Sequence, residues 1–103
     1  MANPHRGDVE ASFGGRVRVF RLTLGALAEL EAKLGADGIA GLAARFEGGR
    51  VSAADLLVTL ACGLRGAGEA VTDDEVAGWP LDGGVAAAAK IAADLLRATF
   101  AEP

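Results

Sequence analysis

The segment from Val9 to Leu34 constrains the fold most, because a short β-hairpin there leads directly into an amphipathic helix. Alternating apolar residues on both sides of Gly14-Gly15 are typical of a tight hairpin turn. An isolated hairpin is only marginally stable in water, so its apolar face must be covered. The later helices provide that cover, which predicts an α+β fold with an N-terminal β-hairpin packed on a bundle of about five helices.

The register of the hairpin decides which side chains face the core. A two-residue turn at Gly14-Gly15 places Arg18 opposite Ala11 and so mixes charge into the apolar side. A three-residue connection places Val17 opposite Phe13 instead. The sequence favours this second register, a bulged hairpin whose apolar face consists of Val9, Ala11, Phe13, Val17 and Val19.

The first helix is expected over residues 23–34. Thr23 is a suitable N-cap, because its hydroxyl can accept a hydrogen bond from the first turn. Gly35 supplies the C-terminal stop, and Glu29 and Lys33 are spaced to pair on the outer side.

Glu31 is unusual in this helix, because at about 100° per residue it falls on the apolar stripe between Leu24 and Leu27. In one interpretation it lies at a groove edge or pairs with a hairpin arginine, as buried carboxylates normally find a partner. In the other, this part of the stripe meets another protein.

Four more helices are predicted beyond Gly35, separated by glycine-rich joints. Capping boxes are expected at Ser52 with Asp55 and at Thr72 with Glu75. The helix after Ser52 is apolar nearly all round and belongs at the centre of the fold. The last helix carries a long apolar stripe made of Val85, Ala88, Ala89, Ala92, Leu95, Leu96 and Phe100.

Two joints call for comment. Asp37 is the expected cap of the short second helix. The joint from Gly63 to Val71 is rich in glycine and is expected to be mobile. It is not expected to bind a nucleotide, because it follows a helix and no Gly-Lys-Ser/Thr comes after it.

The length of 103 residues is enough for one core, so a single domain spanning residues 1–103 is expected. Within it, residues 1–7 are expected to be disordered, residues 8–22 to form the hairpin and residues 23–101 to form the helical body.

The charge balance excludes several partners. The formal net charge is −4, whereas nucleic acid requires a dense basic face. The arginines near the hairpin are expected to be solvated and balanced by Asp8 and Glu10. No apolar run reaches the ~20 residues of a membrane span and no signal-peptide core is present. We therefore expect a cytoplasmic protein that binds neither nucleic acid nor membrane.

Catalytic and metal-binding residues are scarce. His5 is the only histidine and falls in the terminus expected to be disordered. Cys62, the only cysteine, lies on the most apolar helix, where an inert buried thiol is favoured over a nucleophile. Asp73, Asp74 and Glu75 are better explained as helix-start carboxylates than as a cation site. The sequence therefore predicts no enzyme activity, no catalytic or metal-binding residue and no cofactor.

A family resemblance lies in the stretch from Arg21 to Glu31, which reads Arg-Leu-Thr-Leu-Gly-Ala-Leu-Ala-Glu-Leu-Glu. It follows a glycine-turned hairpin and precedes a helical body that ends in an Ala/Leu-rich helix. In these features, from about Asp8 to Phe100, the chain resembles the small gene transfer agent family proteins of alphaproteobacteria, which belong with phage tail proteins. Members are labelled tail tube proteins, whereas their size and genomic position resemble those of phage tail assembly chaperones.

A tail tube protein and a tail assembly chaperone require different structures. A tail tube subunit closes into stacked rings through an extensive sheet, and one hairpin supplies too few strands for such a wall. The sequence therefore favours a non-catalytic chaperone that coats the helical tape measure protein and supports tube assembly. A structural tail tube component, associated with the particle, is the alternative, and a small enzyme is the third.

The resemblance implies the tape measure protein, tail tube subunits or both as partners, and a homo-oligomer is compatible with it. Binding is expected to use exposed apolar stripes on helices. Ordinary core packing is the competing interpretation for each of these apolar residues. The candidate partner-binding residues are Leu24, Leu27, Glu31, Leu95, Leu96 and Phe100.

Overall fold

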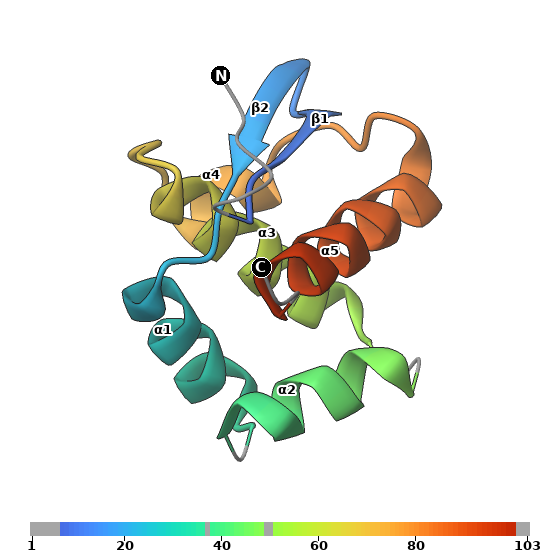
Figure 1. The fold of residues 1–103 in the computed structure, drawn as a ribbon. Coiled ribbons are helices and arrows are strands. Elements are labelled where there is room, and N and C mark those ends of the chain that lie inside the picture. The colour runs from blue at the N-terminus through green and yellow to red at the C-terminus, as the bar shows by residue number, and fades with distance from the viewer. Residues whose placement is uncertain (1–6, 37, 49–50, 101–103) are drawn as a thin grey trace.

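The computed structural model describes residues 7–36, 38–48 and 51–100 and confirms the α+β fold. An antiparallel hairpin lies at one end, and the other helices surround α3 (Figure 1). His5 and the cap predicted at Asp37 lie outside the described residues. The elements are β1 (Val9–Phe13), β2 (Arg16–Phe20), α1 (Leu24–Leu34), α2 (Gly38–Glu47), α3 (Ala53–Gly66), α4 (Asp73–Ala77) and α5 (Gly84–Phe100).

The predicted bulged register is wrong. A two-residue turn at Gly14-Gly15 joins the strands, and Phe13 pairs with Arg16. Both glycines have positive φ values, 65° and 89°, which is the combination that a type I′ turn requires. The one-residue slip turns Val17 outwards, where it is 62% exposed. On the face towards the core lie Val9, Ala11, Phe13, Arg18 and Phe20, with the exposed Arg16 on the same face at the turn.

Arg18 shows why a charge is tolerated on this face. Its guanidinium donates hydrogen bonds to the backbone oxygens of Phe13 (2.6 Å) and Gly14 (3.2 Å). It also forms an ion pair with Glu69, and its central carbon lies 3.9 Å from the centre of the Trp79 ring. A buried charge is stable when its donors are satisfied in this way. The expectation of solvated hairpin arginines is therefore wrong for Arg18.

The predicted helix ends of α1 are confirmed. Thr23 Oγ1 accepts a hydrogen bond from the Ala26 N–H at 3.1 Å, and Gly35 ends the helix in the left-handed conformation with a φ of 66°. An N-cap hydrogen bond such as the one that Thr23 accepts contributes about 1 kcal/mol to stability. The predicted capping boxes also form at the starts of α3 and α4, by Ser52 with Asp55 and by Thr72 with Glu75.

The α3 helix lies at the centre, as predicted, and packs against α1, α5 and β2. Two of its glycines permit these close contacts. A Cβ atom added at Gly66 would lie 1.9 Å from the Arg21 backbone oxygen, and one at Gly63 would lie 2.8 Å from a methyl carbon of Leu95. The Arg21 N–H also donates to the Gly63 oxygen at 2.9 Å. These glycines thus allow α3 to pack closely against the chain at the end of β2. The sequence had predicted a mobile joint from Gly63 onwards.

The start of the described chain is tied to the rest of the fold. Gly7, which the sequence placed in the disordered segment, is buried beside the backbone of Ala98. Asp8 accepts two hydrogen bonds from the Arg21 guanidinium, at 2.6 and 2.9 Å. One cluster of buried apolar side chains spans the hairpin and the described helices. None of these helices is long and apolar enough to cross a membrane.

Candidate partner-binding surface

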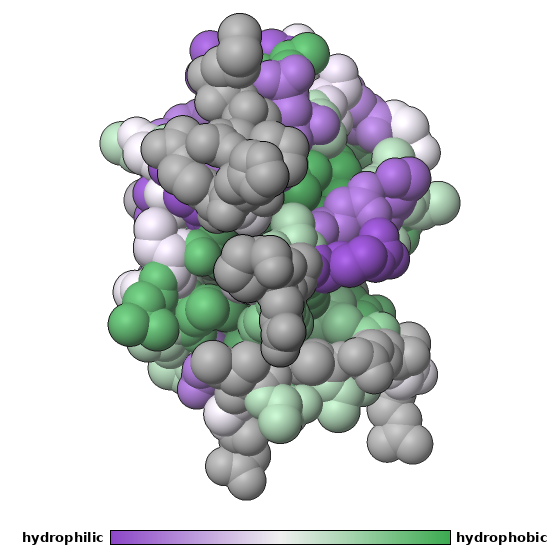
Figure 2. All heavy atoms as spheres, viewed as in Figure 1, coloured by the Kyte–Doolittle hydropathy of each residue, from purple (hydrophilic) through white to green (hydrophobic). Residues whose placement is uncertain are grey.

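The six residues predicted to bind a partner differ widely in exposure. Leu27, Leu95 and Leu96 join one core cluster and are at most 8% exposed, so they hold the fold and offer no outer surface. Leu24 is 79% exposed, and the remaining two, Glu31 and Phe100, are half-buried. Figure 2 shows apolar residues gathered over α1 and polar residues over the outer side of α5.

Glu31 forms no ion pair within the described part of the chain. The described hairpin arginines pair with other carboxylates, those of β2 with Glu69 and Arg21 with Asp8. The interpretation in which a hairpin arginine neutralises Glu31 therefore has no support. The half-buried position leaves the groove-edge and partner interpretations open.

An apolar groove that the sequence analysis missed lies between the first half of α3, α4 and the start of α5. Its volume is about 380 Å³, which is within the range of ligand pockets, roughly 300 to 1,000 Å³. Leu81 and Val85 are 53% and 59% exposed at its border. The large side chains that line it include Phe13, Leu57, Val76, Trp79, Leu81 and Val85.

The groove had one sequence signal. Trp79, Pro80 and Leu81 follow one another in the loop between α4 and α5, although loops are normally polar. Helical periodicity does not detect such a loop, and it grouped Val85 with the long apolar stripe of the last helix. Large apolar residues in a short interhelical loop are the feature that indicates this groove.

The hairpin turn packs beside the groove and positions Trp79. The Gly15 N–H donates to Asp82 Oδ2 at 2.9 Å. A Cβ atom at Gly14 would lie 2.5 Å from the Trp79 ring. Phe13 meets Trp79 edge to face, with ring centres 6.0 Å apart. The turn and the loop after α4 therefore hold each other in place.

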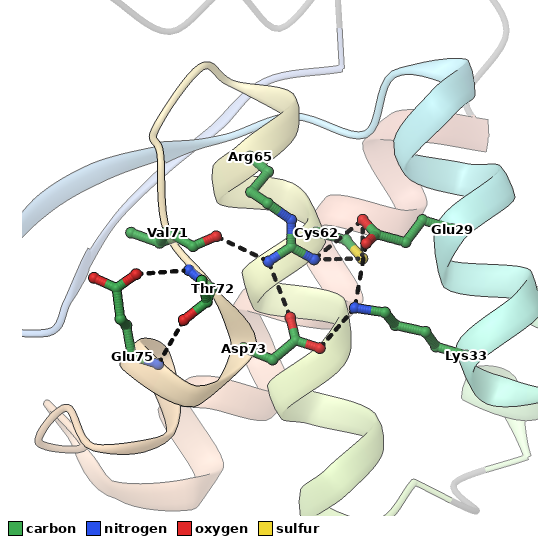
Figure 3. Close-up of polar contacts among 8 residues, drawn as sticks. All are labelled: Glu29, Lys33, Cys62, Arg65, Val71, Thr72, Asp73 and Glu75. Carbon is green, nitrogen blue, oxygen red and sulfur yellow. Dashed lines mark hydrogen bonds and ion pairs between the residues drawn. The ribbon is translucent and has the colours of Figure 1, made fainter.

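A network of charged side chains joins α1, α3 and α4 on another part of the molecule (Figure 3). Arg65 donates to Glu29 at 3.1 Å and to Asp73 at 2.9 Å. Lys33 contacts the same two carboxylates at 3.2 and 2.8 Å. The predicted pair of Glu29 and Lys33 is thus confirmed within a larger cluster. Two cations balance two anions, so the network joins three helices without a net charge.

Cys62 lies against this network and is fully buried. The pKa of Cys62 is raised to about 12. Burial is the larger cause, and the second is the hydrogen bond that the thiol donates to Glu29 Oε1 at 3.3 Å. The thiolate is therefore scarce at neutral pH, which favours the interpretation of an inert thiol. Among residues 7–36, 38–48 and 51–100, no cluster of histidine, cysteine and carboxylate side chains could hold a metal ion.

The network makes the stability of the protein sensitive to acid. The hydrogen bond from Arg65 holds the pKa of Glu29 below its ordinary value. The contribution of Glu29 is therefore fully present above the unfolded pKa of about 4.3 and is lost as the pH falls through the lower folded pKa. We expect the urea midpoint to be constant between about pH 5 and 7 and to fall below about pH 4.

Two variants test this acid sensitivity. In Glu29→Gln the acid decline of the urea midpoint is expected to be shallower, because the titrating group is gone. Asp74→Asn is the matched control, since Asp74 has no ion pair in the described structure, and it should keep the wild-type slope. An unchanged profile in Glu29→Gln would rule out this role of Glu29.

Comparison with known proteins agrees with the sequence resemblance. A family model described as phage tail tube protein, GTA-gp10, matches residues 6–102. A search of curated proteins and a search of solved structures each found no match. The matched segment covers nearly the whole chain and confirms the resemblance to the gene transfer agent tail family. This chain therefore belongs to the GTA-gp10 family of phage tail tube proteins.

Proposed function

We propose that this protein helps to build the tail tube of a phage-like particle by binding other tail proteins, without bond chemistry. The family match over residues 6–102 is the observation that carries this proposal. The side chains support its non-catalytic part. Cys62 is buried with a raised pKa, and the charged network of α1, α3 and α4 pairs its cations and carboxylates with each other.

The first candidate role is a structural component of the tail tube, because the family description names that role. Its partners would be other tube subunits, and the protein would remain in the finished particle. A fixed number of copies per ring follows from the symmetry of such an assembly.

The second candidate role is an assembly chaperone for the tape measure protein and the tube subunits. The small sheet favours this role, since the described residues contain two strands of five residues each. A tube wall made of sheet closes through many more strands. The family description nevertheless fits the structural role better, so the chaperone role stands second.

Quantitative mass spectrometry of purified particles separates the two roles. A structural component is expected in a constant ratio to the other tube subunits, at a multiple of the ring symmetry. A chaperone is expected to be abundant in the producing cells and nearly absent from the particles. Co-expression adds a second test, because a chaperone should raise the soluble fraction of the tape measure protein. Absence from the particles together with normal tails in a strain without the gene would contradict the proposal.

A further inference from the structure

We propose that the apolar groove between α3, α4 and α5 binds an amphipathic helix of another tail protein, one whose apolar stripe is flanked by Lys or Arg residues. This inference rests on the proposed function and specifies the site and the chemistry of the partner. Three observations carry it: the groove exposes apolar side chains, carboxylates neighbour its lining residues in the chain, and helices and a loop supply nearly all of its walls.

The groove exposes large side chains that a closed core would bury. Leu81 is 53% exposed and Val85 is 59% exposed, while Leu57 and Trp79 are half-buried. Val85 belongs to the apolar stripe of α5, so this stripe extends beyond the core into the groove. Contiguous apolar surface of this kind typically marks a binding site.

The chain that supplies α4 and the loop after it is acidic. From position 66 to position 89 the chain has five carboxylates and no Lys or Arg. Glu69 and Asp73 are neutralised by arginines of β2 and α3. A partner with basic residues beside its apolar stripe therefore complements the charge of this part of the chain. No Lys or Arg in the described structure forms an ion pair with the other three carboxylates, Asp74, Glu75 and Asp82.

The walls of the groove favour a helix over an extended peptide. Apart from Phe13, every lining residue belongs to a helix or to the loop after α4. A bound strand gains its affinity from main-chain hydrogen bonds to an open sheet edge, whereas a bound helix uses side chains spaced by three and four residues. The lining offers side chains, so a helix is the matching ligand.

Trp79 provides a direct readout, because it is the only tryptophan and it lines the groove. The probe is a synthetic helix of about 18 residues, or roughly five turns, without tryptophan. It carries leucines at i, i+3, i+4 and i+7 and lysines beside them. Titration into the full-length protein is expected to change the Trp79 emission saturably, and binding should weaken as salt is added.

Two control peptides separate the contribution of the lysine charges to binding from that of the apolar stripe. A peptide with glutamates in place of the lysines should bind about tenfold more weakly or worse. A scrambled peptide that keeps the composition but lacks the stripe should give no saturable signal. Equal affinity of the lysine and glutamate peptides, or the absence of binding by the lysine peptide, would overturn the inference.

Variants locate the binding site. The double variant Leu81→Lys with Val85→Lys should weaken peptide binding by about tenfold or more. Val17→Lys is the matched control, because Val17 is 62% exposed on β2 and does not line the groove, and it should bind as the wild type does. An equal loss in both variants would overturn the inference. A second copy of the protein is the other possible occupant of the groove. The inference would also be overturned if the wild-type protein self-associated in sedimentation, the double variant did not, and the lysine peptide failed to bind.

Particle assembly distinguishes this inference from the proposed function. If the gene is required for tails but the double variant supports normal tails, the groove inference fails and the proposed function stands. If tails form normally without the gene, the proposed function itself fails.

Discussion

Replacing Gly66 with alanine is expected to lower the free energy of unfolding by about 3 kcal/mol. The new Cβ atom would lie 1.9 Å from the backbone oxygen of Arg21. The Arg21 backbone has little freedom to move away, because its N–H donates to the Gly63 oxygen at 2.9 Å. Urea denaturation followed by circular dichroism measures the effect.

A loss of stability is the opposite of what this substitution usually does, because alanine normally stabilises a helix by up to about 1 kcal/mol over glycine. Gly25→Ala is the matched control. At Gly25 in α1 the nearest atom to an added Cβ is Thr23 Oγ1 at 4.0 Å, so this variant should be as stable as the wild type or more stable. A Gly66→Ala protein with wild-type stability would refute the close packing of α3 against the Arg21 backbone.

Replacing Arg18 with alanine is also expected to cost about 3 kcal/mol. The change leaves the buried Phe13 oxygen without the 2.6 Å hydrogen bond and removes a cation of Glu69. It also removes the guanidinium that lies over the Trp79 ring. The urea midpoint should fall, and the Trp79 emission should change because its environment loses the cation.

Arg16→Ala is the matched control for Arg18. Arg16 pairs with the same carboxylate, Glu69, at 3.4 Å, but 67% of its side chain is exposed. An exposed ion pair contributes less than about 1 kcal/mol. Equal losses of stability in the two variants would show that burial of the Arg18 guanidinium does not increase its contribution to the free energy of unfolding.

Local signals in the sequence predicted the elements well, because they depend on residues close together in the chain. A cap needs only a side chain and a backbone N–H about three residues apart, as Thr23 and Ala26 show. The central position of α3 likewise follows from its apolar composition alone. Both could therefore be predicted from residues close together in the chain.

The hairpin register depends on distant residues and could not be read in this way. Grouping apolar residues on one face treated Arg18 as a surface residue. Its partner Glu69 lies 51 positions away in the chain, and the Trp79 ring is further still. Only the tertiary structure brings these groups to the hairpin and makes the two-residue turn favourable.

The exposed apolar groove was harder to predict than the fold. The predicted stripe of the last helix included Ala89 and Val85, but both are exposed, and Ile91, which the stripe left out, is buried. Burying isoleucine removes more apolar area from water than burying alanine does, so the helix presents Ile91 to the core. Val85 then borders the groove, together with a loop that has no helical periodicity.

Electron microscopy of particles from a strain that lacks this gene tests the proposed function most directly. If the protein helps to build the tail tube, these particles lack tails, and a wild-type copy of the gene restores them. Tails of normal number and length in the absence of the protein would contradict a role in building the tube.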